Sequence, residues 1–192
     1  MTTKFKTIEQ SFEDHEKVLF QTRELFLKIE EISEVCENAL KQNHKILICG
    51  NGGSAADAQH IAAEFIGRFH NERISLPAIA LTTDTSILTS IANDYSYEDV
   101  FSRQIEGLGQ KGDVFWGIST SGNSKNVNRA FYSAKKKGLK TIGFTGKDGG
   151  QMVNLSDLSL VIPSDITARI QEMHLLCAHI VCEIIDNIDW KN

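Results

Sequence analysis

Two side chains on one predicted helix have the types and spacing needed for acid–base or metal chemistry. His60 and Glu64 stand four residues apart in Ala55–Ile66, a run of strong helix formers without a breaker. At that spacing the two side chains share a helix face, roughly 5–6 Å apart. An imidazole and a carboxylate can exchange protons or bind a metal. The alternative is an exposed pair of little energetic worth.

A glycine-rich turn precedes that helix. Ile46–Cys49 is short and apolar, as expected of a buried strand, and the GNGG sequence at 50–53 follows it. Ser54 is then the expected helix N-cap. Free backbone N–H groups and the positive end of the helix dipole form an anion site at such a junction. The combination predicts a phosphorylated substrate whose reacting end lies farther along the helix.

The same turn also fits the dinucleotide fingerprint G-x-G-x-x-G/A, with GNGGSA at 50–55. That fingerprint needs an acidic residue about 20 positions on, at the end of the next strand. The next strand is predicted at Pro77–Leu81, so Asp84 comes too late, and Glu72 lies in a polar connector. A sugar or phosphate cradle is favoured, while a dinucleotide site and purely structural glycines remain alternatives.

A second unusual loop, Ser119–Ser124 (STSGNS), carries four hydroxyl groups in six residues. It lies between a predicted strand, Asp113–Ile118, and a predicted helix, Lys125–Lys137. Hydroxyls and backbone amides at a helix N-terminus bind phosphate or polyol groups without an arginine. The alternative is an ordinary flexible turn. A serine nucleophile is disfavoured because no G-x-S-x-G elbow is present.

Three polar residues interrupt the apolar face of the last predicted helix, which runs from about 166 to 188 and is expected to be capped at Ser164 or Asp165. They are Gln171, His174 and His179. Because burying them unpaired would be costly, we expect them to have partners. Gln171 and His179 are separated by roughly 12 Å along the helix and ~80° around it. One metal could meet both only if the side chains reach toward each other or a second subunit supplies one.

Short apolar strands alternate with helices along the chain, which predicts an α/β fold with a doubly wound parallel sheet. Ligands bind such sheets beyond the carboxyl ends of the strands, where both unusual loops lie. The predicted strands are 46–49, 77–81, 113–118, 141–145 and 158–162. The predicted helices are 55–66, 85–92 (followed by an Asn93-Asp94 loop), 97–108, 125–137, a short one ending at 152, and 166–188.

The N-terminal region, from about 7 to 42, contains no Gly or Pro and repeats apolar residues every seven positions: Val18, Leu25, Ile32 and Ala39. One helix of ~35 residues would be ~50 Å long, more than this domain needs. It must break near its middle or pack against another subunit, and we favour oligomerisation. The chain is thus predicted to be one domain, 1–192, with a helical region for oligomerisation at 1–42 and a doubly wound core at 45–188.

Composition narrows the class of protein. The 192 residues suffice for one domain, and 41% hydrophobic with 23% charged residues is typical of a soluble protein. A net charge of −5 and the lack of a basic stripe argue against nucleic acid as a partner. No signal peptide or 18-residue apolar run is seen, so no membrane association is expected. Four cysteines without C-x-x-C spacing indicate reduced thiols and a cytoplasmic location.

These motifs, GNGGS, H-x-x-x-E, ND, STSGNS and RIQExH-x-x-x-x-H, together resemble the sugar isomerase (SIS) domain family and, more narrowly, the phosphoheptose isomerases. The resemblance extends from Lys45 through Asp186. It implies a flavodoxin-like, three-layer domain with a five-stranded parallel sheet, assembled as a homotetramer with sites between subunits. It also implies interconversion of sedoheptulose 7-phosphate and D-glycero-D-manno-heptose 7-phosphate. That is the first step toward ADP- or GDP-heptose for lipopolysaccharide or other surface glycans.

The resemblance also implies roles for individual residues. One zinc ion per site would be held by His60, Glu64, Gln171 and His179. The implied substrate contacts are Asn51, Gly52, Gly53, Ser54, Glu64, Asn93, Asp94, Ser119, Thr120, Ser121, Ser124 and Gln171. An enediol mechanism needs a base on carbon and an acid near oxygen. Glu64 is the candidate base and His179 the candidate acid, with the reverse assignment open.

Two other functions occur on similar sequences. SIS proteins that bind the bacterial replication initiator resemble this chain in the GNG, ND and RIQEMH segments, but they lack acid–base residues at the positions of Glu64 and His179. This chain has both, which favours an enzyme. A regulatory sugar-phosphate sensor would not need the pair either.

Overall fold

The structure is a computed structural model and describes residues 2–190. Its centre is one five-stranded sheet with every neighbouring pair parallel, in the order β2-β1-β3-β4-β5. The strands are β1 (Ile46–Cys49), β2 (Ala78–Ala80), β3 (Val114–Ile118), β4 (Lys140–Gly146) and β5 (Leu158–Ile162). This is the flavodoxin-like order, in which the chain reverses its direction of winding between β1 and β3. The predicted doubly wound α/β fold is confirmed.

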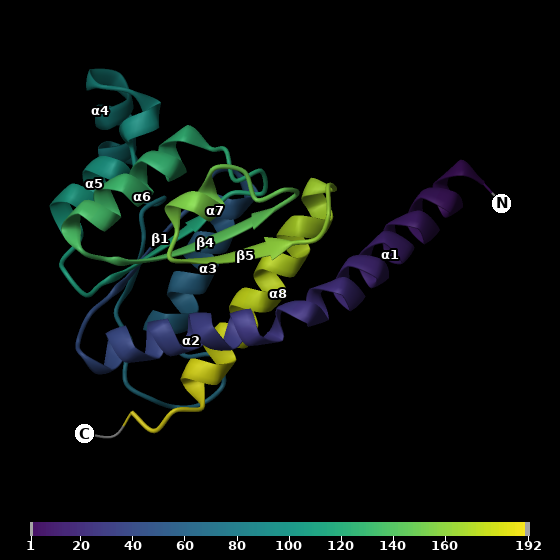
Figure 1. The fold of residues 1–192 in the computed structure, drawn as a ribbon, viewed down its shortest axis with the longest axis horizontal. Coiled ribbons are helices and arrows are strands. Elements are labelled where there is room, and N and C mark those ends of the chain that lie inside the picture. Colours follow the sequence, from purple (N-terminus) through teal and green to yellow (C-terminus); the bar gives the residue numbers. More distant parts are fainter. Residues whose placement is uncertain (1, 191–192) are drawn as a thin grey trace.

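Helices cover both faces of the sheet (Figure 1). They are α1 (Thr3–Thr22), α2 (Phe26–Lys41), α3 (Gly53–Ile66), α4 (Thr85–Asp94), α5 (Ser102–Leu108), α6 (Lys125–Lys137), α7 (Met152–Leu155) and α8 (Thr167–Asp186). Two short 3-10 turns, Arg23–Leu25 and Tyr97–Asp99, join α1 to α2 and precede α5. One apolar cluster joins α2, α3 and α8 to one face of the sheet, and a second joins α5, α6 and α7 to the other.

Strand alternation explains the three layers. In β1, Ile46 and Ile48 belong to the cluster beneath α2, α3 and α8, whereas Leu47 belongs to the opposite cluster. On β3, Trp116 belongs to the same cluster as Ile46 and Ile48, and Phe115 belongs to the opposite cluster. Successive strand side chains point to opposite faces, so continuously apolar strands can occur only in a sheet covered on both sides.

The N-terminal helix breaks near its middle, at the 3-10 turn Arg23–Leu25. The seven-residue stripe then packs on the chain itself: Val18, Ile32 and Ala39 are buried, and Leu25 is half-buried against the same core. It was therefore wrong to assign that stripe to another subunit. A different apolar set is exposed on α1 and α2, comprising Phe5, Ile8, Phe12, Leu19, Phe20, Phe26 and Leu27. Much of α1 extends beyond the body of the domain (Figure 1).

Several predicted helix ends were wrong. The short helix predicted to end at 152 instead begins there, as α7, and the helix predicted at 97–108 is divided into a 3-10 turn and α5, which begins at Ser102. Gly52, not Ser54, caps α3, because its positive φ of 56° makes the tight turn and Ser54 is buried in the first turn. Helix α4 continues through Asn93 and Asp94 rather than ending before them. Helix α8 begins at Thr167 without a side-chain cap, since the Ser164 hydroxyl accepts the Ile166 N–H instead.

Within residues 2–190, no helix has the length and apolar character needed to span a membrane. All four cysteines are free and buried, as the sequence predicts.

Candidate active site

The glycine turn after β1 supplies an anion cradle of backbone N–H groups. The N–H of Ser54 donates to the Asn51 carbonyl at 3.0 Å, and the N–H of Ala55 donates to Gly52 at 3.1 Å. Among the described residues, the N–H groups of Gly52 and Gly53 make no such bond, which leaves them for a ligand. Gly52 is exposed, with nothing within 4 Å of a Cβ built on it. Ser54 is buried beneath this turn, so its side chain is not the accessible group that the sequence suggested.

The hydroxyl loop after β3 lies at the N-terminus of α6. The hydroxyls of Ser119 and Ser124 are 2.8 Å apart, and the Ser121 hydroxyl accepts the Asn123 N–H at 3.2 Å. Thr120 is half-buried and makes no side-chain hydrogen bond to any other residue in 2–190. The loop therefore offers one unengaged hydroxyl and a paired set at a helix N-terminus, an arrangement suited to phosphate or sugar hydroxyls.

An amide pair holds the two loops together. The Asn51 amide donates to Asn126 Oδ1 at 2.9 Å, and the Asn126 amide donates back to Asn51 Oδ1 at 2.8 Å. The Tyr97 hydroxyl also donates to Asn51 Oδ1, at 3.2 Å. Asn126 is buried at the start of α6. The carboxyl ends of β1 and β3 are thus bridged at the switch point of the sheet.

His60, Glu64 and His179 form one compact cluster, with a donor atom from each lying within 4.8 Å of the others. His60 Nε2 is 2.8 Å from His179 Nε2 and 3.4 Å from Glu64 Oε1. One ring must carry a proton on Nε2 and the other must not. The side chains of His60 and Glu64 are 47% and 20% exposed, so the cluster is open to a ligand. Helices α3 and α8 supply it from two distant segments of sequence.

The surroundings of His179 favour its neutral form. Burial lowers the pKa of its imidazole below the usual value near 6.5, the nearby His60 lowers it further, and Glu64 partly opposes this. The Phe69 ring lies against it, with centroids 5.7 Å apart. At neutral pH the ring is therefore a neutral donor or acceptor rather than a fixed cation.

Gln171 lies in a different part of the site. Its amide lies directly over Gly53, so that a Cβ there would collide with it. His60 is seven residues farther along α3, a rise of ~10 Å. Within one chain, Gln171 therefore faces the start of the glycine-turn helix, as a substrate contact would. The donors that the structure groups together for a metal are His60, Glu64 and His179.

Asn93 and Asp94 are exposed on the last turn of α4, and the Asn93 amide donates to Asp94 at 2.8 Å. Among residues 2–190, no side-chain hydrogen bond joins either to another predicted site residue. The pair is therefore exposed and not hydrogen-bonded to the glycine turn, the hydroxyl loop or the His60, Glu64 and His179 cluster among the described residues.

His174 is a core residue. It is 1% exposed, and its Nε2 lies 2.9 Å from the Thr145 carbonyl oxygen. When protonated, this nitrogen donates a hydrogen bond to that oxygen. Burial lowers its pKa to about 4, against a smaller opposing effect of that hydrogen bond. The Thr145 carbonyl is the partner that we expected for His174, and the contact joins two parts of the core rather than the active site.

Three further residues belong to the site although sequence analysis did not single them out: Asn126, Tyr97 and Asp57. Asn126 and Tyr97 join the site through their hydrogen bonds to Asn51. Asp57 is half-buried on α3 near His60. Burial raises the pKa of its carboxyl, and the charge of His60 partly opposes this. For Asp57, spacing was an available signal, since it stands three residues before His60 on the same helix.

Comparison with known proteins agrees with this geometry. The family model of the SIS domain matches residues 12–146. The phosphoheptose isomerase of Sulfurimonas denitrificans is 56% identical over 179 residues, covering 93% of this chain and 91% of that protein. That of a Nitratiruptor species is 58% identical over 180 residues, covering 93% and 96%.

Two solved structures share the whole architecture. The phosphoheptose isomerase of Neisseria gonorrhoeae superposes with a TM-score of 0.93 at 43% identity, covering 97% of this chain and all of that one. That of Francisella tularensis gives 0.95 at 35% identity, with the same coverage. The chain therefore belongs to the SIS-domain family and, within it, to the phosphoheptose isomerases.

Proposed function

We infer that this enzyme interconverts sedoheptulose 7-phosphate and D-glycero-D-manno-heptose 7-phosphate. The single observation that carries this is the meeting of Glu64 and His179 in one open cluster, with Glu64 on α3, the helix whose N-terminus is the anion cradle, and His179 on α8. A protein that only bound a sugar phosphate or a protein partner would need the cradle but not the acid–base pair.

Substrate binding follows from the two loops. We assign the phosphate to neutral donors at the N-termini of α3 and α6, namely backbone N–H groups and the hydroxyls of the 119–124 loop. Such donors keep a dianionic phosphate in place by hydrogen bonds and helix dipoles. Gln171, beside Gly53, is positioned to contact the sugar chain.

Isomerisation moves one proton between C2 of the aldose and C1 of the ketose, and another between their oxygens. We assign the carbon proton to the Glu64 carboxylate, which is partly shielded from water. His179, held neutral, donates and recovers the oxygen proton. Its lowered pKa suits this shuttle, because a neutral imidazole can give a proton on one nitrogen and accept on the other.

Zinc is the cofactor we propose, one ion per site. Two imidazoles and a carboxylate are a ligand set that zinc accepts, and tetrahedral ligands at bonds of about 2.0–2.1 Å stand roughly 3.3 Å apart. The present separations of 2.8 and 3.4 Å need little adjustment to meet that spacing. When bound, the ion would polarise the substrate oxygens as a Lewis acid. Gln171 is the fourth ligand we propose, supplied by a second subunit, because within one chain its amide lies over Gly53 at the start of α3.

We propose a homotetramer with sites completed between subunits. The support is the exposed apolar face of α1 and α2, where Phe20 and Leu27 are 71% and 74% exposed. Contiguous exposed apolar surface of this kind marks an interface. A second chain would also explain how Asn93 and Asp94 reach a substrate. Light scattering of the wild type and of Phe20→Glu tests this, since a monomeric wild type would remove the proposal.

We place the enzyme in the cytoplasm, supported by its four free, buried thiols.

The test of function is a turnover assay on sedoheptulose 7-phosphate and a panel of shorter ketose phosphates, with metal content measured on the same sample. We expect turnover of the heptulose and a loss on chelation that zinc restores. Absence of turnover in zinc-loaded, folded protein would overturn the assignment.

A further inference from the structure

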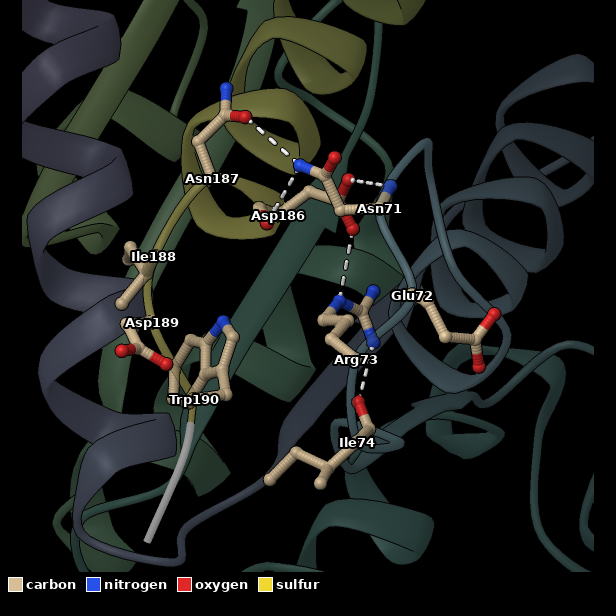
Figure 2. A pocket seen from close by; sticks show the side chains of 9 residues that line it. All are labelled: Asn71, Glu72, Arg73, Ile74, Asp186, Asn187, Ile188, Asp189 and Trp190. Carbon is tan, nitrogen blue, oxygen red and sulfur yellow. Dashed lines mark hydrogen bonds and ion pairs between the residues drawn. The ribbon is translucent and has the colours of Figure 1, made fainter.

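A buried carboxylate ties together the two helices that carry the reactive cluster. Asp186 is the last residue of α8, seven positions after His179, so it lies on the same helix face about two turns away. Its side chain is 1% exposed. It accepts hydrogen bonds from the backbone N–H groups of Phe69, His70 and Asn71, at 3.3, 2.9 and 2.7 Å, and from Arg73 Nε at 3.0 Å. Figure 2 shows Arg73 directed at this carboxylate and Asn71 beside it, with the Asn71 side-chain amide turned to Asn187 and the Asp186 main-chain carbonyl. These residues line a cavity of about 660 Å³.

The charge on Asp186 is favoured in the folded protein. Burial by itself raises the pKa of this carboxyl, but the three N–H groups and the Arg73 charge outweigh it, and the pKa is lowered. Four donors already engage the carboxylate, so it has little capacity for a ligand. Its contacts instead point to a role within the fold.

Arg73 carries the connection on to α3. Its guanidinium is 6% exposed and donates to the carbonyls of Glu64, at 2.8 Å, and Phe65, at 2.9 Å. These carbonyls belong to the last turn of α3, where no intrahelical donor is available. The same arginine therefore binds α8 through Asp186 and the backbone of Glu64 itself.

The loop held by Asp186 also supports His179. Asp186 fixes the backbone of Phe69 and His70, and the Phe69 ring contacts the His179 ring. The orientation of His179 and the position of Glu64 thus depend on the same pair of buried charges.

We propose that Asp186 and Arg73 are positioning residues for the isomerisation, fixing α3 against α8 so that Glu64 and His179 stand at a working separation. They do not contact the substrate. The inference rests on the proposed function, because it assigns the reaction to that cluster. The phosphate cradle lies at the other end of α3, ~16 Å from Glu64, so loss of the connection should reduce kcat and leave KM nearly unchanged.

The chain contains a matched control. Asp113 is also 1% exposed and accepts the N–H groups of Lys45 and Gln110 together with the Lys45 ammonium, but it precedes β3 at the opposite end of the sheet. Asp113→Asn removes a similar buried charge far from the cluster. It reports the effect of lost stability alone.

The experiment measures kcat, KM and thermal unfolding for the wild type, Asp186→Asn and Asp113→Asn, well below the lowest unfolding temperature. We expect Asp186→Asn to lower kcat by roughly tenfold to a hundredfold, as misplaced catalytic groups do, with KM within about threefold. Asp113→Asn should keep kcat within about twofold. A wild-type kcat in Asp186→Asn, a change confined to KM, or equal kcat losses in both variants would overturn the proposal.

If Asp186→Asn does not fold, Arg73→Lys takes its place under the same criteria, since lysine keeps the charge beside Asp186 but not the fork that reaches the carbonyls of Glu64 and Phe65. An inactive wild type would instead count against the proposed function. An active wild type with fully active variants would count against this inference alone.

Discussion

Polar groups at the two ends of the sheet differ in how fully they are hydrogen-bonded by the chain itself. At the amino ends of the strands, Asp113 is saturated by Lys45 and Gln110, and Asp157 accepts both the N–H and the hydroxyl of Thr141 at 2.9 Å. At the carboxyl ends, polar groups remain available to a ligand. They are the N–H groups of Gly52 and Gly53 and the partly exposed side chains of His60 and Glu64.

This difference provides a criterion for distinguishing polar residues that stabilise the fold from those that carry function. A group whose donors and acceptors are all engaged by its own chain stabilises the fold. A group held in place but not saturated is available for chemistry. The predictions below use that distinction, from the largest expected effect to the smallest.

Glu64→Gln and His179→Gln should each lower kcat/KM by about 10³-fold, within the range that general acid–base groups contribute. Both residues lie on regular helices whose formation does not depend on these side chains, so circular dichroism should report an unchanged fold. Steady-state kinetics on sedoheptulose 7-phosphate provide the measurement. Turnover near the wild-type rate in either variant would contradict the proposed roles.

His174 stands near the carboxyl end but is buried, with Nε2 at the Thr145 carbonyl and Nδ1 without a hydrogen-bond partner among residues 2–190. Because this enclosed site favours the neutral ring, we expect His174 to affect stability rather than turnover. Its folded pKa of about 4 lies below the unfolded value near 6.5, so between these values the unfolded state binds more protons. Stability is then fully present above pH 6.5 and falls by roughly 3 kcal/mol as pH drops to 4.

Urea unfolding of the wild type and His174→Phe across that pH range measures this contribution. The variant should show a shallower pH dependence. Parallel curves for the two proteins would show that His174 is not the source of the acid sensitivity.

Asp113→Asn should lower the free energy of unfolding by about 2 kcal/mol, because it weakens hydrogen bonds to a buried charge. Its kcat should stay unchanged, since the residue belongs to the saturated end of the sheet. Denaturant unfolding and kinetics on one sample test both statements. A stable variant with impaired turnover would break the comparison between the two ends.

Tyr97→Phe should have the smallest effect. It removes one 3.2 Å hydrogen bond to Asn51 but leaves the amide pair with Asn126 intact. We expect KM to rise about twofold, consistent with a neutral hydrogen bond of modest net worth. A KM increase above tenfold would mean that the hydroxyl itself binds substrate.

Local patterns predicted the parts of the fold and site that depend on neighbouring residues. The apolar run Ile46–Cys49, the glycines after it and the i, i+4 pair His60–Glu64 all act within one strand–turn–helix segment. Helix α6 was bounded correctly because Lys125–Lys137 is followed by Gly138, whose φ of 78° ends it. The cap on α3 was misplaced because a glycine with positive φ closed the turn before any side chain was needed.

Contacts that depend on tertiary packing could not be predicted. Asn126 pairs with Asn51 across 75 positions, and Asp186 gathers the loop at 69–73 from more than 110 positions away. Neither residue type nor spacing identifies such partners. The seven-residue stripe was assigned to an interface for the same reason, since only the packed structure distinguishes Ile32, in the core, from Leu27, in solvent on the same helix α2.

The most direct test of the central claim is isomerisation of sedoheptulose 7-phosphate in heavy water, followed by proton NMR, with the wild type and Glu64→Gln. A carboxylate that carries the carbon proton exchanges part of it with solvent before returning it. The account predicts partial deuterium at C1 of the ketose and C2 of the aldose with the wild type, and neither turnover nor label with Glu64→Gln. Many wild-type turnovers without any label, which a direct hydride shift would give, would contradict it.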